Sequence, residues 1–530
     1  MRVMISRQGS GASRWLAAFL VAAFGVSAAD VVTYEEFGAV GDGVHDDQAA
    51  IVAAHDAANE RKLPVRAKDG ATYLIGGGAT TAVIMTDVDF GKAKFIVDDT
   101  HVEKRGSPIF RVPSGLQGYP VTGITSLRKG QKNLGVTLRG VAMVRVQDAN
   151  VRQFIRSGGN ANEGQTKQEL LLVKPNGDID RHTPVVQEFE TVTSAVAFPV
   201  DKTPLTIRGG DFTTLHNREN HELKNQGYFG RGFQVMRSRV RIEGLRHELK
   251  GQGETAAPYG GFLGFSCCVG VRVKDCVLSA HRNICTQGTY DIGASNAIGL
   301  TFVNCREMTD ILDTGNWGIF GSNYCRDITF DGCEFSRFDA HCGVMNATIR
   351  NSKIGFVGIN AIGWGTFLVE DSTVYGRCFF NLRSDYGSTW DGEFVVRNCT
   401  YVPACGKTAC GVLVGGRNDG KHDYGYVCRM PRKITVDGLK IDDRNHPANY
   451  EGAWIFGDLC PANTSKDFTA RYPYHVTEEV VLKNIATASG ERLRVSPNDF
   501  MFRDVKIERD GMRKWKVPAK SPAGDSYVRH

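Results

Sequence analysis

Six residues in the middle of the chain are of types that move protons or hold anions. They are His281, Asp291, Asp313, Asp339, His341 and Arg383. Carboxylates and imidazoles transfer protons, and an arginine binds a carboxylate through two parallel hydrogen bonds. The three aspartates are separated by 22 and 26 residues. A fold that repeats at about this interval would bring their side chains together, so these six are the candidate catalytic groups.

Aromatic, amide and further charged residues lie in the same part of the chain. They are Glu254, Tyr259, Arg282, Tyr290, Trp317, Asn323 and Asn360. Aromatic faces stack on sugar rings, while amide and charged groups hydrogen-bond to hydroxyls and carboxylates. Together with the first six, these residues predict a cleft that binds and processes a carbohydrate.

A short repeated pattern predicts the elements that position these residues. It consists of an apolar residue, any residue, then Asp, Asn or Gly, and then Cys, Ser or an aliphatic residue. The clearest third positions are Asp275, Asn304, Gly332, Asn351, Asp371 and Asn398, at intervals of 29, 28, 19, 20 and 27 residues. Weaker copies have Asp148, Gly209, Gly244, Gly438, Asn484 and Asp504 at this position.

Each copy predicts a short strand followed by a tight turn. Segments such as VRVKDC, LTFVNC and FVVRNC alternate apolar with polar residues and favour β-branched ones. The Asp, Asn or Gly that follows tolerates a positive φ and is expected to have a structural role in the turn. Strands and turns stacked at this interval predict an all-β fold, a single-stranded parallel β-helix.

The segment 33–58 supports this fold. TYEEFGAVGDGVHDDQAAIVAAHDAA predicts a strand, a glycine-rich turn and a helix capped by Asp46, which would cover the open end of the first coil. Within it, FGAVGDGVHDDQAAI resembles the entry motif of the pectate-lyase-like superfamily of right-handed parallel β-helices. The resemblance implies a carbohydrate ligand and leaves the reaction open, because one fold hosts many chemistries.

Three segments are predicted along the chain. Residues 1–29 combine arginines, the apolar run WLAAFLVAAFGV and small residues, which predicts a signal peptide. Residues 30–510 form the β-helix with side loops, and residues 511–530 form a basic C-terminal tail. We therefore expect a secreted or periplasmic protein with no membrane insertion after signal removal.

The net charge indicates which partners the protein could bind, and the cysteine positions indicate which cysteines could form disulfides. The net charge of +6 is spread along the chain, so the sequence does not predict nucleic-acid binding and is compatible with an anionic polysaccharide. Cys276, Cys305, Cys333 and Cys399 share one position of the repeat and predict a buried ladder of free thiols. Two pairs, Cys405 with Cys410 and Cys428 with Cys460, are better candidates for disulfides.

The favoured chemistry is β-elimination from a glycan that contains uronic acid. In this reaction a base removes the proton next to the carboxylate while donors neutralise that carboxylate. The candidate bases are His281, His341 and Tyr290, and the candidate neutralising residues are Arg282, Arg337 and Arg383. Many lyases that resemble this fold use calcium for neutralisation, and Asp310, Asp313 and Asp339 are the oxygen ligands that calcium would need.

Two alternatives stay open. The first is glycoside hydrolysis by two carboxylates, with Asp291, Asp313 and Asp339 as the acid and base candidates. The NTD, adjacent-Asp and GHG motifs of polygalacturonase-type hydrolases are absent from the central repeats. The second alternative is a non-catalytic glycan-binding or tailspike-like β-helix protein.

Overall fold

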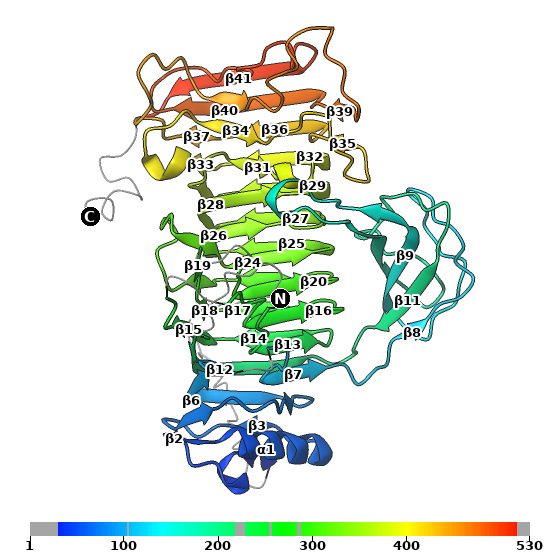
Figure 1. Cartoon of the computed structure of the whole chain (residues 1–530), viewed down its shortest axis with the longest axis vertical. Helices are drawn as coiled ribbons and strands as arrows, with labels where there is room; N and C mark the ends of the chain where they lie inside the picture. Colours follow the sequence, from blue (N-terminus) through cyan, green and yellow to red (C-terminus); the bar gives the residue numbers. More distant parts are fainter. Residues whose placement is uncertain (1–29, 103–104, 218–227, 254–256, 284–287, 517–530) are drawn as a thin grey trace, which may run out of the picture.

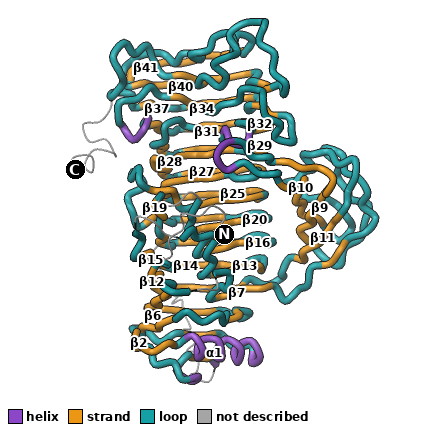
Figure 2. The backbone as a smooth tube through the Cα atoms, in the orientation of Figure 1, coloured by secondary structure: helices purple, strands orange, loops and turns teal. Residues whose placement is uncertain are grey.

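The chain winds into an elongated column of stacked parallel strands, with a small separate sheet on one side (Figure 1, Figure 2). The computed structural model describes residues 30–102, 105–217, 228–253, 257–283 and 288–516. The predicted signal peptide and Glu254 lie outside these residues. A complete turn of chain around the column, called a rung below, contributes one strand to each of three stacks. This arrangement confirms the predicted parallel β-helix.

The strands divide among the stacks as follows. The first stack contains β1 (Val32–Thr33), β3 (Val65–Arg66), β14 (Val240–Glu243), β17 (Arg272–Lys274), β21 (Thr301–Val303), β25 (Cys325–Asp331), β27 (Val344–Arg350), β29 (Gly363–Glu370), β32 (Trp390–Arg397) and β36 (Lys433–Asp437). The second contains β2 (Asp42–Asp46), β4 (Thr72–Ile75), β15 (Arg246–Lys250), β18 (Val277–Leu278), β22 (Arg306–Glu307), β30 (Thr373–Val374), β33 (Thr400–Tyr401) and β37 (Lys440–Ile441). Four long strands run through both, namely β6 (Val88–Asp98), β12 (Leu205–Leu215), β40 (Glu479–Thr487) and β41 (Lys506–Lys514).

The third stack forms the face that matters for function. It contains β5 (Ala82–Val83), β7 (Phe110–Pro113), β13 (Phe233–Met236), β16 (Leu263–Ser266), β20 (Ile292–Ser295), β24 (Phe320–Asn323), β31 (Phe380–Leu382), β34 (Val412–Gly415) and β38 (Trp454–Phe456). Two strands reach it from the second stack, β26 (Glu334–Asp339) and β28 (Lys353–Ala361). Outside the stacks, β19 (His281–Arg282) pairs with β23 (Asn316–Gly318), and β35 (Cys428–Arg429) pairs with β39 (Tyr474–His475).

The turn between the first and second stacks has the predicted backbone. The five repeat residues Asp275, Asn304, Asn351, Asp371 and Asn398 have φ values from 47° to 53°. This left-handed region suits Asn and Asp better than other side chains. The turns are also linked along the column, because the Asn304 amide donates to the Asp275 carboxylate at 3.2 Å.

The core of the column is a continuous apolar filling of stacked side chains. Phe95 and Phe212 on neighbouring rungs stack with their ring centroids 4.5 Å apart, and Phe302 meets Phe330 edge to face at 5.4 Å. Cys276, Cys305, Cys333 and Cys399 are buried in the predicted ladder. Since parallel stacking repeats one position about every 4.8 Å, each thiol packs against its equivalents in the neighbouring rungs.

Cys410, Cys428 and Cys460 form no disulfide, so the two suggested disulfides are wrong. The Cys405 thiol lies 3.4 Å from the carbonyl oxygen of Tyr375. The Cys410 thiol lies 3.7 Å from that of Gly452. The thiols of this first suggested pair therefore contact different parts of the backbone.

The two ends of the core are closed differently. At the N-terminal end, α1 (Gln48–Arg61) is the predicted capping helix and buries Ile51, Ala54 and Ala58. It begins after Asp47, and the Asp46 carboxylate accepts a hydrogen bond from the Gln48 N–H at 3.0 Å. At the other end, Phe502 stacks on Phe456 at 4.4 Å.

The last strand, β41, ends at Lys514, so residues 511–514 of the segment set apart as a tail extend the sheet. Among the described residues, no helix is long and apolar enough to cross a membrane.

An inserted module between β7 and β12 carries the small separate sheet. It contains β8 (Tyr119–Pro120), β9 (Ala142–Gln153), β10 (Gln165–Val173) and β11 (Ser194–Pro199), paired antiparallel in the order β10-β9-β11-β8. The repeat copy at Asp148 lies in β9 and is therefore not a rung. The sequence predicted side loops on the β-helix but no separate sheet in this part of the chain.

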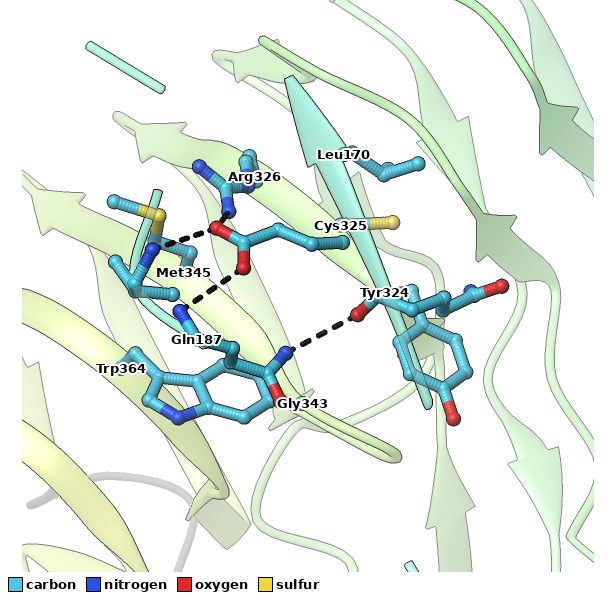
Figure 3. Close-up of a pocket in the computed structure, with 11 residues that line it drawn as sticks. Leu170, Gln187, Tyr324, Cys325, Arg326, Gly343, Met345 and Trp364 are labelled. Atoms are coloured by element: carbon cyan, nitrogen blue, oxygen red, sulfur yellow. Dashed lines mark hydrogen bonds and ion pairs between the residues drawn. The ribbon is translucent and has the colours of Figure 1, made fainter. Parts of the chain in front are cut away.

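A buried ion pair fixes the inserted module to the column. The Glu169 carboxylate on β10 meets the Arg326 guanidinium on β25 at 2.5 Å, and both side chains are almost fully buried (Figure 3). Glu169 also accepts the N–H groups of Val186 at 2.7 Å and Gln187 at 3.0 Å. Arg326 donates further to the carbonyl oxygen of Pro184 at 2.9 Å. Each buried charge is thus compensated by an opposite charge and by hydrogen bonds, which offset the cost of removing it from water.

Replacing Arg326 by Met is expected to loosen this junction. The change leaves the Glu169 charge buried and without its cation, at a cost of about 3–5 kcal/mol. Hydrogen exchange should accelerate in β9 and β10 and leave the distant β4 and β6 unchanged. Adding Glu169→Met should restore much of the protection. Unchanged exchange in Arg326→Met would show that apolar contacts alone hold the module.

Candidate functional site

Glycines form a side-chain-free floor on the outer face of the third stack. Gly264, Gly293 and Gly321 are register partners on β16, β20 and β24. A Cβ at Gly264 would meet only the carbonyl oxygen of Phe233 at 3.5 Å, whereas one at Gly293 would clash with that of Gly260. Because the Tyr290 ring covers Gly321 and the Gly260 carbonyl covers Gly293, a ligand can approach the backbone closely at Gly264.

A row of polar residues runs beside the glycines. Ser266, Ser295 and Asn323 are register partners on the same three strands. The next rung continues the row with His341, whose N–H donates to the carbonyl oxygen of Ser322 at 2.8 Å. Neighbouring members lie about one strand spacing, roughly 4.8 Å, apart. The stack therefore presents an ordered set of donors and acceptors along the column.

Loops and the inserted module turn this face into a groove with a volume of about 870 Å³. Tyr290 and Trp317 form part of one wall, and the Tyr290 ring lies over Gly321, close enough that a Cβ there would approach it to 2.9 Å. Arg156 and residues 159–162, which connect β9 to β10, enclose the groove from the side of the inserted module.

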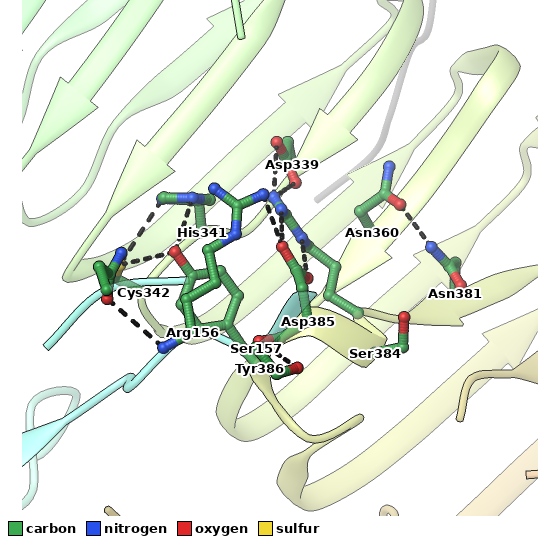
Figure 4. Close-up of polar contacts among 12 residues, drawn as sticks. Arg156, Ser157, Asp339, His341, Cys342, Asn360, Asn381, Ser384, Asp385 and Tyr386 are labelled. Carbon is green, nitrogen blue, oxygen red and sulfur yellow. Dashed lines mark hydrogen bonds and ion pairs between the residues drawn. The ribbon is translucent and has the colours of Figure 1, made fainter. Parts of the chain in front are cut away.

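A cluster of alternating charges lies at one end of the groove (Figure 4). The Asp339 carboxylate is fully buried and is bound by Arg337 at 2.8 Å and by Arg383 at 3.0 Å. Arg383 also forms a bidentate pair with Asp385 at 2.7 and 3.1 Å. Arg156 reaches the same Asp385 at 2.8 Å. Three guanidinium groups against two carboxylates leave one net positive charge beside the groove.

The surroundings of Asp339 keep it ionised. Burial alone would raise the pKa of its carboxyl, but Arg337 and Arg383 outweigh burial and lower the pKa to about 2. The Tyr290 hydroxyl donates to the same carboxylate at 3.0 Å. Burial, together with the negative charge of Asp339, raises the pKa of Tyr290. Tyr290 is therefore a protonated phenol at neutral pH.

His341 is held as a neutral imidazole. Its Nδ1 lies 2.7 Å from Oδ1 of Asn323, and its Nε2 lies 2.9 Å from the Tyr386 hydroxyl. Burial lowers the pKa of His341 to about 3, and the Arg383 charge acts in the same direction. Because Asn323 Oδ1 can only accept, Nδ1 carries the proton and Nε2 is the basic nitrogen.

Five of the residues singled out from the sequence line the groove together, and a sixth lies directly behind it. The five are Tyr290, Trp317, Asn323, His341 and Arg383. The sixth, Asp339, is covered by Arg383 and Tyr290. They come from four of five successive rungs, so the repeat brings together residues up to 93 positions apart.

Three other candidates lie inside the protein, away from the groove. Asp291 is fully buried and pairs with His247 at 2.8 Å and His281 at 3.3 Å. Tyr259 donates to the buried Asp99, which Arg231 also binds at 2.9 Å. The polar residues at these positions form hydrogen bonds and ion pairs with one another inside the column. Their recurrence in the sequence therefore reflects buried polar networks between the second and third stacks.

The remaining candidates are scattered. The Asp313 carboxylate accepts the Gly315 N–H at 2.8 Å within a turn, and Arg282 is exposed on β19. Asn360 is buried and accepts from Asn381 at 2.6 Å. Asp310 accepts the Leu312 N–H, so Asp310, Asp313 and Asp339 do not share a site. In the part of the chain that the structure describes, no group of three or more His, Cys, Asp or Glu residues could hold a metal ion.

Arg156 and the glycine floor were missed by the sequence reasoning. Arg156 belongs to the inserted module, and its position in the sequence carries no repeat signal. The glycines do carry one, since LGFS, IGAS and FGSN recur at intervals of 29 and 28 residues. A search for repeated glycines next to a Ser or Asn would have found the floor.

Comparisons with known proteins agree with the fold. No family model matches the chain. The chain is 22% identical over 220 residues to a capsule KL64-specific depolymerase of Klebsiella phage P510, a match that covers 39% of this chain and 20% of that protein. The chain thus spans about a fifth of the length of this curated relative.

Solved structures show the same architecture. The tailspike gp61 of Pseudomonas phage phi297 superposes with a TM-score of 0.52 at 13% identity, covering 86% of this chain and 80% of the tailspike. The tailspike gp49 of Pseudomonas phage LKA1 gives a TM-score of 0.46 at 13% identity, covering 86% and 81%. The stacked parallel sheets and the first of these superpositions establish the fold as a parallel β-helix.

The depressed pKa of His341 predicts acid sensitivity. An unfolded histidine takes up a proton near pH 6.5, whereas folded His341 resists protonation down to about pH 3. The free energy of unfolding should therefore fall as the pH drops from 6.5, by roughly 3 kcal/mol at pH 4. Urea unfolding of the His341→Gln variant should show a shallower slope between pH 6.5 and 4. Equal slopes for both proteins would contradict the buried neutral imidazole.

Proposed function

We propose that the protein is a polysaccharide lyase that cleaves a glycan containing uronic acid by β-elimination in the groove. The observation that carries this proposal is the lining of the groove. Among the described residues it includes arginine, histidine, asparagine, glutamine, tyrosine and tryptophan side chains with serines, glycines, alanines and one phenylalanine, and it includes no carboxylate. Such a surface binds an anionic sugar and leaves the proton transfers to imidazole and phenol groups.

Arg383 and Arg156 would bind the sugar carboxylate. Both line the groove, and both already face carboxylates, so their guanidinium groups are oriented before substrate arrives. Positive charge next to the sugar carboxylate stabilises the electron density that develops there when the neighbouring proton leaves. The net positive charge of the cluster supports this role.

His341 and Tyr290 would move the two protons. The Tyr386 hydroxyl would turn away from Nε2 as substrate enters. Nε2 then takes the proton from the carbon next to the carboxylate, and the electron pair of that bond forms the carbon–carbon double bond. The bond to the glycosidic oxygen breaks, and the Tyr290 hydroxyl protonates that oxygen. Transfer of the proton from His341 to Tyr290, through solvent, restores both groups. Substrate negative charge offsets the Arg383 charge and increases the basicity of His341.

Two-carboxylate hydrolysis has less support. It requires a protonated carboxylic acid facing the sugar and a second carboxylate across from it. Asp339 is bound by two arginines and its pKa is lowered to about 2, so it is a poor acid. Asp291 is enclosed with two histidines, and Asp313 belongs to a turn.

The depolymerase match supports polysaccharide cleavage as the general activity. The name of that relative specifies a capsule as its target, and the aligned region is a fifth of its length. We include in the proposal the secreted or periplasmic location that residues 1–29 predict, since a polymeric glycan is encountered outside the cytoplasm. A polysaccharide is the proposed partner, and neither nucleic acid nor a membrane is.

The direct test is the ultraviolet absorbance of the conjugated double bond that elimination creates. The protein would be incubated with a panel of acidic polysaccharides, with and without calcium. Rising absorbance supports the lyase. New reducing ends without absorbance would indicate hydrolysis, and binding without either product would indicate a glycan-binding protein.

The variant His341→Gln is expected to lose at least a hundredfold in kcat, because glutamine retains hydrogen bonds to Asn323 and Tyr386 but has no basic nitrogen. Arg156→Gln should mainly raise KM, since it removes part of the carboxylate-binding charge. Circular dichroism would verify that both variants fold. Full activity of His341→Gln would remove the histidine from the catalytic groups.

A side chain on the glycine floor should block the groove without unfolding the protein. Gly264→Val places a strand-compatible residue where a Cβ meets its nearest neighbour at an ordinary 3.5 Å. We expect an unchanged melting temperature and a tenfold or larger loss of kcat/KM. Gly293→Ala is the contrast, because its Cβ clashes with the Gly260 carbonyl and should lower the melting temperature. Full activity of Gly264→Val would place the substrate elsewhere.

A further inference from the structure

A second cleft opens between the inserted sheet and the rungs, next to the groove. It has a volume of about 450 Å³. The inserted sheet supplies Gln147, Gln165, Thr166 and Gln168 to its lining, and the rungs supply Ser295 and Asn296. The cleft is continuous with the groove, because Ser295, Asn323 and His341 line both. A chain of sugars in the groove could therefore extend into it.

A directed row of hydrogen bonds orders the amides of this cleft. Gln147 donates to Gln168 at 3.1 Å, and Gln168 donates to Asn296 at 2.7 Å. Asn296 in turn donates to the Ser295 hydroxyl at 3.1 Å. The row crosses from the inserted sheet to the third stack and ends at the polar row of the groove. Each amide is thus oriented and retains further donor or acceptor capacity for a ligand.

The charge of the cleft differs from that of the groove. Its amide and hydroxyl groups are uncharged, and the charged or titratable groups Arg156 and His341 lie where the two spaces meet. Amides and hydroxyls match the mixed donors and acceptors of sugar hydroxyls. They supply none of the positive charge that the groove offers to an acidic sugar.

We infer that this cleft is a subsite for an uncharged sugar unit, adjacent to the acidic unit that Arg156 and Arg383 hold. The inference rests on the proposed function and narrows its substrate class. The preferred glycan is a heteropolymer in which acidic and neutral sugars are neighbours. A polymer that is acidic at every unit would place a carboxylate against uncharged amides and lose the hydrogen bonds of the neutral unit.

Affinity electrophoresis in polysaccharide-containing gels tests this inference independently of turnover. The probes are polygalacturonate, which is acidic at every unit, and gellan, hyaluronan and purified bacterial capsular polysaccharides that combine glucuronic acid with neutral sugars. We expect at least one mixed polymer to retard the protein more strongly than polygalacturonate does. Stronger retardation by polygalacturonate than by every mixed polymer, or no retardation by any probe, would overturn the inference.

Two changes in the cleft give the matching variant test. Gln165→Leu is the cleaner one because its side chain is exposed, and Gln147→Leu removes the start of the amide row. Each should weaken binding of the preferred mixed polymer by about tenfold and leave polygalacturonate binding unchanged. Gln131→Leu, a half-buried glutamine of the same module outside both spaces, is the control.

The outcomes separate the subsite from the chemistry. Equal losses for both polymer classes, or no loss in either variant with melting temperatures intact, would overturn the subsite. Selective loss of mixed-polymer binding in a protein that forms no unsaturated product would uphold the subsite and overturn the lyase proposal.

Discussion

The geometry of this protein depends on parallel backbone hydrogen bonding between successive rungs. That bonding fixes the distance from one rung to the next at about 4.8 Å, whatever the length of the loops between strands. Residues 19 to 29 positions apart therefore become neighbours, while loops of different length extend outward. The glycines of β16, β20 and β24 and the polar row from Ser266 to His341 are direct results of this regular spacing. An insertion as large as the module between β7 and β12 leaves the spacing intact.

A buried carboxylate organises the charged end of the groove. Asp339 has lost its hydration, and Arg337, Arg383 and Tyr290 replace it with directed donors. The same contacts hold Arg383 and Tyr290 in place at the groove, so orientation is achieved before a ligand binds. Asp385 performs the complementary task for Arg156, which belongs to a different part of the chain. Because water is excluded from these carboxylates and guanidinium groups, their electrostatic interactions are stronger, and an unpaired charge among them would be costly.

The repeated pattern in the sequence was sufficient to predict the parallel β-helix and some of the residues that line the groove. Asp and Asn tolerate the positive φ angle of the turn between the first two stacks. The turn role of Asp275 and its equivalents could therefore be assigned from residue type alone. His281 and Asp291 show where such reasoning fails. Their types suit catalysis equally well, and only the packing of His247 against Asp291 reveals that they satisfy each other inside the protein. Arg156 lies 185 residues before His341, on a module outside the repeat, so its proximity follows from tertiary docking alone.

The docking of that module has a consequence for how the protein assembles. The inserted sheet pairs residues as far apart in sequence as Pro120 and Val196, and it has its own apolar core around Val144, Val146 and Leu171. The central rungs instead pair residues 19 to 29 positions apart, so each new rung closes a shorter loop onto the one before it. The enclosing wall of the groove and its floor are thus separate folding units. The binding surface exists only after the two have met, which makes the formation of the Glu169–Arg326 contact a late step in maturation.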